Sequence, residues 1–273
     1  MRPMTAQGLC LLALLVAATS AQADQWTKTY AVSGTPELRM ETGDGNLHVS
    51  RSEHREIAVR VETRNWTIGE GGLRVEERQN GDRVEVFLHF PHRVHFSFGI
   101  DRPKRVDIWV QVPRDANLDL HTADGSIELE GIRGDLRLDT SDGHVEADDV
   151  DGNVRIHTGD GHVRVRGRFD ILEVRSGDGR VEATALAGSK LAAGWSLTTA
   201  DGSMELVVPK DLAADVEIHT GDGHVDTDLP ITIAGRWGGH DLRGRLNGGG
   251  PPLRLRSGDG SIYLRTGGTS GSL

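Results

Sequence analysis

A six-residue pattern recurs along this chain and constrains its fold more than any other feature. The pattern is Thr or Ser, any residue, Asp, Gly, any residue and then an apolar residue, and it occurs eight times. Its Asp-Gly pairs are Asp44-Gly45, Asp124-Gly125, Asp142-Gly143, Asp160-Gly161, Asp178-Gly179, Asp201-Gly202, Asp222-Gly223 and Asp259-Gly260. The interval between successive aspartates is constant from Asp124 to Asp178 and longer beyond it. A fixed period of this kind is typical of stacked repeats.

The residues around each Asp-Gly pair alternate between apolar and polar. After Asp160, for example, Val163 and Val165 are apolar, whereas His162 and Arg164 are polar. Each unit is therefore two strands around a turn, with one apolar face that a single unit cannot bury. Stacking equivalent strands buries this face. The sequence thus predicts an all-β fold, a β-solenoid resembling a single-stranded β-helix, with coils of ~18 residues stacked about 4.8 Å apart.

Two other folds are compatible with parts of the pattern. A three-sided left-handed helix of hexapeptide repeats also has coils of this length, but its inward residue recurs every six positions, so it ranks second. A twisted antiparallel meander would accept the Asp-Gly hairpins but does not explain the period, so it ranks third. Within the solenoid, we expect Asp to cap each turn with its side chain and Gly to adopt a positive φ. A second turn is expected at Gly134-Asp135 and at Asp151-Gly152.

Residues 1–23 have the features of an export signal. Arg2 precedes an apolar run from Leu9 to Ala18, and Ala21-Gln22-Ala23 is a small-x-small cleavage site. The mature chain is therefore expected to begin at Asp24. Cys10 lies inside the apolar run, in a context that does not favour lipidation.

The rest of the chain divides into three parts. Residues 24–113 are expected to form an N-terminal β region that holds the first repeat and an antiparallel capping sheet, with a hairpin turn at Asn80-Gly81. Residues 114–265 form the solenoid, interrupted by a glycine-rich stretch from Gly235 to Pro252. Residues 266–273 are expected to be a flexible tail.

The composition limits the cellular compartments and the classes of partner that are plausible for this chain. Cys10 is the only cysteine, so the mature chain can hold no disulfide. The formal net charge is -10, which disfavours general binding to nucleic acid or anionic lipid. No transmembrane segment is expected in the mature chain. Together these features predict a bacterial protein of the periplasm or cell surface.

The repeats also resemble a known family. Val112-Pro113 leads into Leu118-Asp-Leu-His-Thr-Ala-Asp-Gly-Ser-Ile-Glu-Leu129, and a related stretch runs from Leu246 to Ile262. These segments resemble the β-strand-repeat envelope proteins of bacteria grouped as "putative adhesins", a domain family of unknown function. The resemblance implies a β-solenoid and an envelope location. It implies no catalytic residues.

Histidines beside the turns are the candidates for a metal site. His144 and His162 fall in one outward column, His157 flanks the same turn, and Asp160 lies between them. Three imidazoles could bind a transition metal, but the column also contains Ser126 and Arg180, and a dedicated site would not be copied from repeat to repeat. We therefore expect no metal and no cofactor. His89, His92 and His95 lie in an exposed loop with no common metal-ligand spacing.

No catalytic constellation is evident in the sequence. Charged columns such as Glu146, Arg164 and Glu182 are explained by pairing between neighbouring rungs. The sequence favours a non-enzymatic envelope protein whose solenoid is a platform for binding or scaffolding. The alternative is a carbohydrate-active or cation-dependent protein that acts on envelope polysaccharide. The partner, an envelope protein or polysaccharide, is not specified by the sequence.

Overall fold

The computed structural model describes residues 23–91, 104–233 and 239–267, and the regular structure of these ranges is all β-strand. The strands are β1 (Ala23–Ala31), β2 (Glu37–Thr42), β3 (Gly45–Ser52), β4 (Glu56–Arg64), β5 (Arg74–Asn80), β6 (Arg83–His89), β7 (Arg105–Pro113), β8 (Asn117–Thr122), β9 (Ile127–Glu130), β10 (Arg133–Thr140), β11 (Val145–Thr158), β12 (Val163–Ser176), β13 (Val181–Ala185), β14 (Trp195–Thr199), β15 (Met204–Val208), β16 (Ala214–Thr220), β17 (Val225–Thr227), β18 (Ile231–Ile233), β19 (Asp241–Leu246), β20 (Pro252–Ser257) and β21 (Ile262–Thr266).

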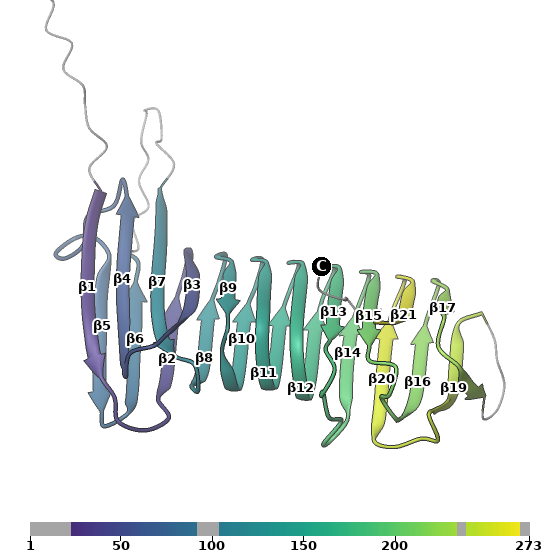
Figure 1. Ribbon diagram of the computed structural model, residues 1–273. Helices are drawn as coiled ribbons and strands as arrows, with labels where there is room; N and C mark the ends of the chain where they lie inside the picture. Colours follow the sequence, from purple (N-terminus) through teal and green to yellow (C-terminus); the bar gives the residue numbers. More distant parts are fainter. Residues whose placement is uncertain (1–22, 92–103, 234–238, 268–273) are drawn as a thin grey trace, which may run out of the picture.

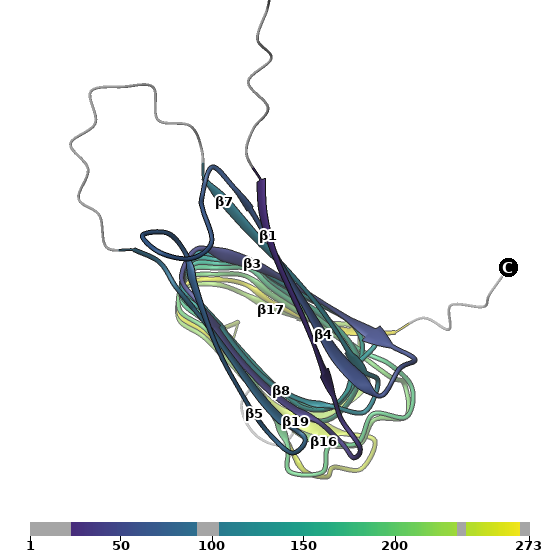
Figure 2. The same ribbon diagram turned by 90° about the vertical axis from the view of Figure 1, so that its left-hand side faces the viewer.

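Each repeat contributes one strand to each of two long faces, which form the sides of a flattened coil (Figure 2). The pre-turn face holds the strands that precede the Asp-Gly turns, and the post-turn face holds those that follow them. Leu118, Leu136, Val154 and Leu172 pair in parallel register on the pre-turn face, each one repeat after the last. The predicted solenoid is confirmed. Parallel pairing between successive coils excludes the meander, and two faces rather than three exclude the hexapeptide helix.

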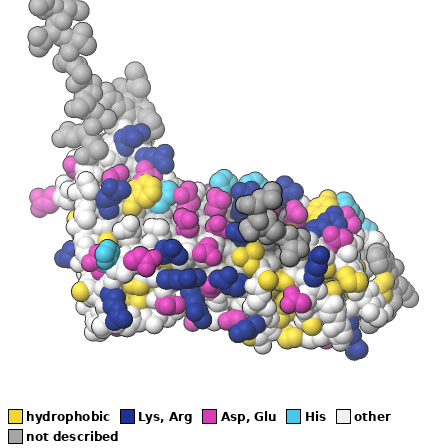
Figure 3. Space-filling view, in the orientation of Figure 1, with side chains coloured by type: hydrophobic (Ala, Val, Ile, Leu, Met, Phe, Trp, Pro, Cys, Tyr) yellow, Lys and Arg dark blue, Asp and Glu magenta, His cyan; other side chains and the backbone are white. Residues whose placement is uncertain are grey.

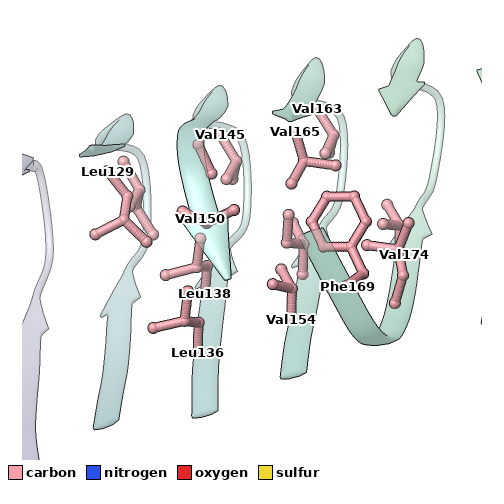
Figure 4. Close-up of a cluster of buried hydrophobic side chains, with 14 of the residues drawn as sticks. Leu129, Leu136, Leu138, Val145, Val150, Val154, Val163, Val165, Phe169 and Val174 are labelled. Carbon is pink, nitrogen blue, oxygen red and sulfur yellow. The ribbon is translucent and has the colours of Figure 1, made fainter. Parts of the chain in front are cut away.

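The core between the two faces is a set of aliphatic ladders (Figure 4). Leu136, Leu138, Val145 and Val154 are buried there, each next to its equivalent in the adjacent rung. Phe169 adds an aromatic ring that lies edge-on to the ring of Trp195 at 6.0 Å. The alternation seen in the sequence therefore assigns the inward side chains correctly, because the strand period of two puts every second residue inside.

The hydroxyl residue that begins each repeat pattern is buried in all eight copies. In six copies its oxygen accepts a hydrogen bond from the N–H of the turn glycine and donates one to a turn glycine carbonyl in the adjacent rung. At Thr158 these distances are 3.1 Å to Gly161 N and 3.2 Å to Gly143 O. The hydroxyl thus closes its own turn and ties that turn to the neighbouring coil.

The expected reason for the turn glycines is wrong. None of the eight has a positive φ. Instead, a Cβ on seven of them would lie 1.8–2.3 Å from a turn glycine carbonyl oxygen in an adjacent rung, and at Gly161 the distance to Gly143 O would be 1.8 Å. Glycine is required because the stacked turns approach too closely for any side chain.

The second edge of the coil also uses glycine, but within strands rather than in a separate turn. Gly134 and Gly152 lie in register, and Gly152 has a φ of 106°. β11 and β12 run continuously around this edge, with register shifts between Ala147 and Val150 and between Gly152 and Asn153. The predicted turn at Asp151-Gly152 is therefore a bend in the long strand β11, and Gly134-Asp135 lies at the start of β10.

The order of coils in space differs from their order in sequence at both ends (Figure 1). The last repeat, β20 and β21, lies between the β14–β15 coil and the β16–β17 coil, and it pairs in parallel with both. Likewise β2 and β3 lie between β6–β7 and β8–β9. Each terminal repeat thus lies between two other coils instead of at the end of the stack.

The N-terminal end is closed by a mixed arrangement of strands. β1 pairs antiparallel with β4, β4 with β7, and β5 with β6 across the predicted turn at Gly81, which has a φ of 61°. β6 and β7, however, pair in parallel with β2 and β3 and so extend the solenoid itself. Between the two end strands, Glu77 accepts hydrogen bonds from Lys28 and Tyr30. These polar contacts seal the open end of the core.

The C-terminal end is covered by β19, which lies within the predicted glycine-rich stretch. β19 pairs antiparallel with β16 and with β18. β21 runs through Thr266, and Gly267 N donates to Val208 O, so the start of the predicted tail belongs to the β20–β21 rung. Residues 234–238 and 268–273 lie outside the described residues.

Candidate binding surface

The turn aspartates form a row along one edge of the solenoid. All eight are exposed, and their carboxylates make no hydrogen bond or ion pair within the described residues. The prediction that Asp caps its turn is therefore wrong, because the buried hydroxyl three positions before each turn glycine performs that role. We call this row of eight aspartates the acidic edge.

His144 and His162 have a structural role in the described fold. Their rings stack at 5.4 Å between centroids. His144 Nδ1 accepts the backbone N–H of His162 at 3.1 Å, and His162 Nδ1 accepts that of Arg180 at 3.2 Å. Asn46 Oδ1 makes the same contact with Ser126 N at 3.1 Å. These imidazoles continue a ladder of acceptors, so their Nδ1 lone pairs are already used.

The other histidine candidates lie apart from this pair. His157 is at the end of β11, on the pre-turn face, where it pairs with Asp139 and Arg175 rather than with His144. Asp160 lies in the acidic edge between the two faces. His89 is exposed at the end of β6, 3.4 Å from Glu76, and His92 and His95 lie outside the described residues. Within the described ranges, no three His, Cys, Asp or Glu side chains are grouped closely enough to hold a metal ion.

The expected charge pairing across rungs is present. Arg164 lies 3.1 Å from Glu182 and 3.6 Å from Glu146, one on each neighbouring strand. The hydrogen bond that Arg164 donates to Glu182 is the main reason that the pKa of Arg164 is raised. Figure 3 shows acidic and basic side chains interspersed over the visible face of the molecule.

A wide hollow lies on the pre-turn face. It has a volume of about 780 Å³ and is lined by two rows of polar side chains. In one row, Asp119 lies 3.9 Å from both Arg39 and Arg137. The lining residues of the other row are Glu41, His121, Asp139 and His157, which pair in that order on adjacent strands. Hydrogen-bond acceptors thus alternate with imidazoles along this hollow.

A chain of three smaller hollows runs along the post-turn face. Their volumes are about 290, 330 and 180 Å³, and Glu146 lines all three. The first is bordered by Trp109 and His48, with Val49 and Leu129 also in its lining. We call this first hollow the Trp109 furrow. It is open, and it continues across β11 and β12 along the solenoid axis.

Trp109 is held in a fixed position at the rim of this furrow. Its indole is stacked on His48 at 4.1 Å with an interplanar angle of 17°, and the Arg60 guanidinium lies 5.7 Å from the ring centroid. His48 Nδ1 in turn lies 2.7 Å from Glu128 Oε2. Trp109 is nevertheless 41% exposed, one of two large hydrophobic side chains so exposed among the described residues.

Asp107 lies on the other side of His48. His48 Nε2 lies 3.8 Å from Asp107 Oδ1. Burial alone raises the pKa of Asp107, but hydrogen bonds from Asn46 and Arg105 outweigh it and hold the pKa below its ordinary value. Asp107 therefore stays ionised beside the imidazole, but His48 Nε2 is buried without a hydrogen-bond partner, and the ring is held through Nδ1 and Glu128.

Four carboxylates line the furrow, and we call them the acidic quartet: Glu128, Glu130, Glu146 and Asp148. They form two like-charged pairs on neighbouring strands β9 and β11. Asp148 lies 3.2 Å from Arg166, and Glu146 lies 3.6 Å from Arg164. Glu130 has neither a hydrogen bond nor an ion pair within the described ranges. Like charges opposite each other on adjacent strands repel, so this cluster carries excess negative charge.

The sequence analysis did not identify this furrow. Trp109, His48 and Glu128 come from three strands that are far apart in the sequence. Their contact depends on the insertion of β3 between β7 and β9, which no local pattern shows. The one available signal is Trp109 itself, because it occupies a polar position in the alternation of its strand.

The sequence of the chain matches the model of one protein family. The profile of the Toastrack family, DUF4097, matches residues 27–236. The chain therefore belongs to the Toastrack family, a class of β-solenoid proteins, and the resemblance noted from the repeats is confirmed. No curated protein matches the sequence. No helix in the described part of the chain could cross a bilayer.

Several solved structures are similar over most of their length. A putative cell adhesion protein from Clostridium sporogenes is 12% identical, with 90% of this chain and 100% of that chain covered at a TM-score of 0.46. A putative lipid binding protein from Parabacteroides distasonis is 14% identical, with 89% and 98% covered at 0.43. A putative adhesin from Bacteroides fragilis is 11% identical, with 89% and 97% covered at 0.39.

Proposed function

We propose that the protein is an exported, non-enzymatic component of the cell envelope whose solenoid faces serve as a binding or scaffolding platform. One observation carries this proposal. Outward side chains form rows that cross the solenoid rung by rung, as in the row through Glu146, Arg164 and Glu182. A surface built of repeated rows is suited to contact with an extended partner, because it offers many similar groups in line instead of one reactive centre.

The platform is also rigid, which favours binding. Buried hydroxyls join successive turns, and side-chain acceptors such as His144 tie outward columns to the next backbone. A surface fixed in this way loses little conformational entropy when a partner docks. The export signal expected in residues 1–23 and the adhesin-like description of similar proteins support an envelope location.

Fractionation and binding test this function together. The full-length chain with a C-terminal tag should be recovered from the periplasm or cell surface with residues 1–23 removed. The purified mature protein should bind envelope fragments from the producing cells saturably. Recovery in the cytoplasm with an intact N-terminus, or absence of saturable binding, would contradict the proposal.

A second candidate rests on the hollow of the pre-turn face. Its alternating carboxylates and imidazoles, such as Asp139 beside His157, could contact the hydroxyl groups of an envelope polysaccharide and take part in its cleavage. Incubation with envelope polysaccharides, with and without calcium, zinc or a chelator, should release no new reducing or unsaturated ends if the platform function is right. Turnover lost in Asp139→Asn would favour the second candidate instead.

A further inference from the structure

We infer that the Trp109 furrow binds a guanidinium or ammonium group on a basic, extended segment of a partner protein. The inference rests on the proposed platform function and names the partner chemistry of one of its surfaces. Three observations carry it: the charge of the furrow, the exposed aromatic rim, and a second aromatic site on the same face that is already filled.

The excess negative charge of the furrow favours binding of a cation. The acidic quartet is served by two arginines, Arg164 and Arg166, which lie on the far side of β11 on strand β12. Toward the rim, the side chains between Trp109 and the quartet are His48 and Ser50, and neither is an arginine or lysine. A ligand cation placed there would relieve the repulsion between the two carboxylate pairs.

The filled counterpart lies at the other end of the same row. The row through Trp109 continues by strand pairing through His48, Glu128, Glu146, Arg164, Glu182, Glu205, Tyr263 and Asp226. At Tyr263, the guanidinium of Arg265 lies 5.5 Å from the ring centroid and donates to Asp226 Oδ2 at 2.6 Å. An aromatic ring flanked by carboxylates thus holds an arginine of the chain itself.

Trp109 also has an arginine near its ring, Arg60 at 5.7 Å, but Arg60 pairs with Glu62 at 3.3 Å and not with a carboxylate of the acidic quartet. Arg265 comes two positions after Tyr263, and the equivalent residue after Trp109 is Gln111. Gln111 pairs with Ser50, which pairs with Glu130. The neighbouring arginines Arg51 and Arg60 pair with Glu53 and Glu62. Within the described ranges Glu130 therefore has no cationic partner of the kind that Arg265 gives Asp226, and that place is left to a partner protein.

The geometry of the rim favours an arginine or lysine side chain over a free ion. His48 covers one face of the indole and Arg60 approaches the other, so a ligand meets the exposed ring edge. Aliphatic carbons can pack on this edge while the charged end reaches Glu130, as long basic side chains do at other surfaces. The furrow also joins two further hollows along the axis through Glu146, which suits an extended peptide.

Peptide binding measured by fluorescence anisotropy tests the inference. The probe is a fluorescein-labelled peptide of alternating glycine and arginine, and the comparison peptide has neutral citrulline in place of arginine. We expect the arginine peptide to bind saturably and the citrulline peptide at least about tenfold more weakly. Trp109→Ala, and Glu130→Gln combined with Asp148→Asn, should each weaken binding by about tenfold.

Matched variants separate a site from general attraction to an acidic protein. Asp160→Asn combined with Asp178→Asn also removes two negative charges, but from the acidic edge, and should change the affinity for the peptide less than about twofold. Ser50→Arg places a guanidinium next to Glu130 and should block the peptide, whereas Ser203→Arg adds the same charge elsewhere on this face and should not. Circular dichroism checks that each variant is folded.

Equal losses in the furrow and edge variants would overturn the inference, as would equal binding of the two peptides or no saturable binding. If the peptide does not bind while the protein still binds envelope fragments, the inference fails and the proposed function stands. If both are absent, both fail.

Discussion

At the scale of single residues, the buried hydroxyl is the most consequential part of the repeat. Asp and Gly are the most noticeable residues of the pattern, but the Asp carboxylates make no hydrogen bond or ion pair within the described residues, and Gly is needed for space. Thr158 instead satisfies the N–H of Gly161 and the carbonyl of Gly143. A buried backbone group without a partner costs about 1–3 kcal/mol, so this hydroxyl explains why Thr or Ser begins the six copies that make both bonds.

Thr158→Val should therefore destabilise the fold although it preserves shape. We expect the free energy of unfolding in urea to fall by about 2–4 kcal/mol, because two buried groups lose their partner. Thr158→Ser keeps the hydroxyl and should cost less than about 1 kcal/mol, as Ser176 and Ser257 already occupy this position. Equal stability of the Val and Ser variants would show that the hydroxyl is not what holds the turn.

The stacked histidines make a second prediction at this scale. If His162 serves through Nδ1 as a hydrogen-bond acceptor for Arg180 N, an asparagine should replace it, because Asn46 makes this contact in the same column. His162→Asn should unfold within about 0.5 kcal/mol of the parent, and His162→Ala should lose about 1 kcal/mol. Zinc should shift the melting temperature of neither variant. A zinc-dependent stabilisation of the parent that His162→Asn abolishes would restore the metal hypothesis.

At the scale of elements, the inserted terminal repeats are the feature that sets this chain apart from a simple solenoid. β20 and β21 complete the wall between two coils that precede them in sequence. The C-terminal repeat is therefore an internal rung, not a cap. This repeat is packed against a coil on each side. Its loss would therefore open a gap in the stack instead of shortening the stack.

Truncation tests this directly. Removal of residues 252–273 should lower the melting temperature by more than about 10 °C and raise hydrogen exchange in β16 and β17, which lose their neighbour. Removal of residues 268–273 alone is the control, and we expect it to leave the melting temperature unchanged, because β21 ends at Thr266. Unchanged exchange in β14–β17 after the larger truncation would contradict the inserted arrangement.

The N-terminal seal makes the end strands sensitive to acid. Hydrogen bonds from Lys28 and then Tyr30 hold the pKa of Glu77 below its ordinary value of 4.5. A carboxylate with a lowered pKa stabilises the folded state above its unfolded pKa, and this contribution is lost as the pH falls through the lower folded value. Hydrogen exchange in β1 and β5 should therefore rise between pH 5 and about pH 3, and Glu77→Gln should show fast exchange already at pH 7 with a smaller pH dependence. Exchange in these strands that is the same for both proteins at every pH would argue against the seal.

The sequence predicts elements of this kind only where the information is local. Alternation around Asp160 assigns inward Val163 and outward His162, and the constant repeat period predicts parallel rungs, because both depend on neighbours in sequence. Insertion of β20 depends on register between segments separated by a glycine-rich stretch. The Trp109 furrow depends in the same way on the insertion of β3 between β7 and β9. Neither feature could be predicted from the repeat pattern.

At the scale of the whole molecule, charge is distributed unevenly around the coil. The two faces carry paired arginines and carboxylates, as at Arg164, while the acidic edge carries eight carboxylates and no partner within the described ranges. Two unit charges one rung apart repel by about 0.9 kcal/mol in water. The close approach of the turn glycines fixes this spacing, so the repulsion is a cost of the stacked architecture itself.

Removing one edge charge should thus stabilise the protein, which is the opposite of what a capping role would give. Asp160 has like-charged neighbours on both sides and no hydrogen bond to lose, so Asp160→Ser should raise the melting temperature by about 2 °C at low salt. The gain should vanish in 1 M NaCl, where the Debye length is about 3 Å and the repulsion is screened. Asp226→Ser removes the same charge from a carboxylate paired with Arg265 at 2.6 Å and should give no increase. A fall in melting temperature for Asp160→Ser, unaffected by salt, would mean that the carboxylate does support its turn and that the edge carries no electrostatic penalty.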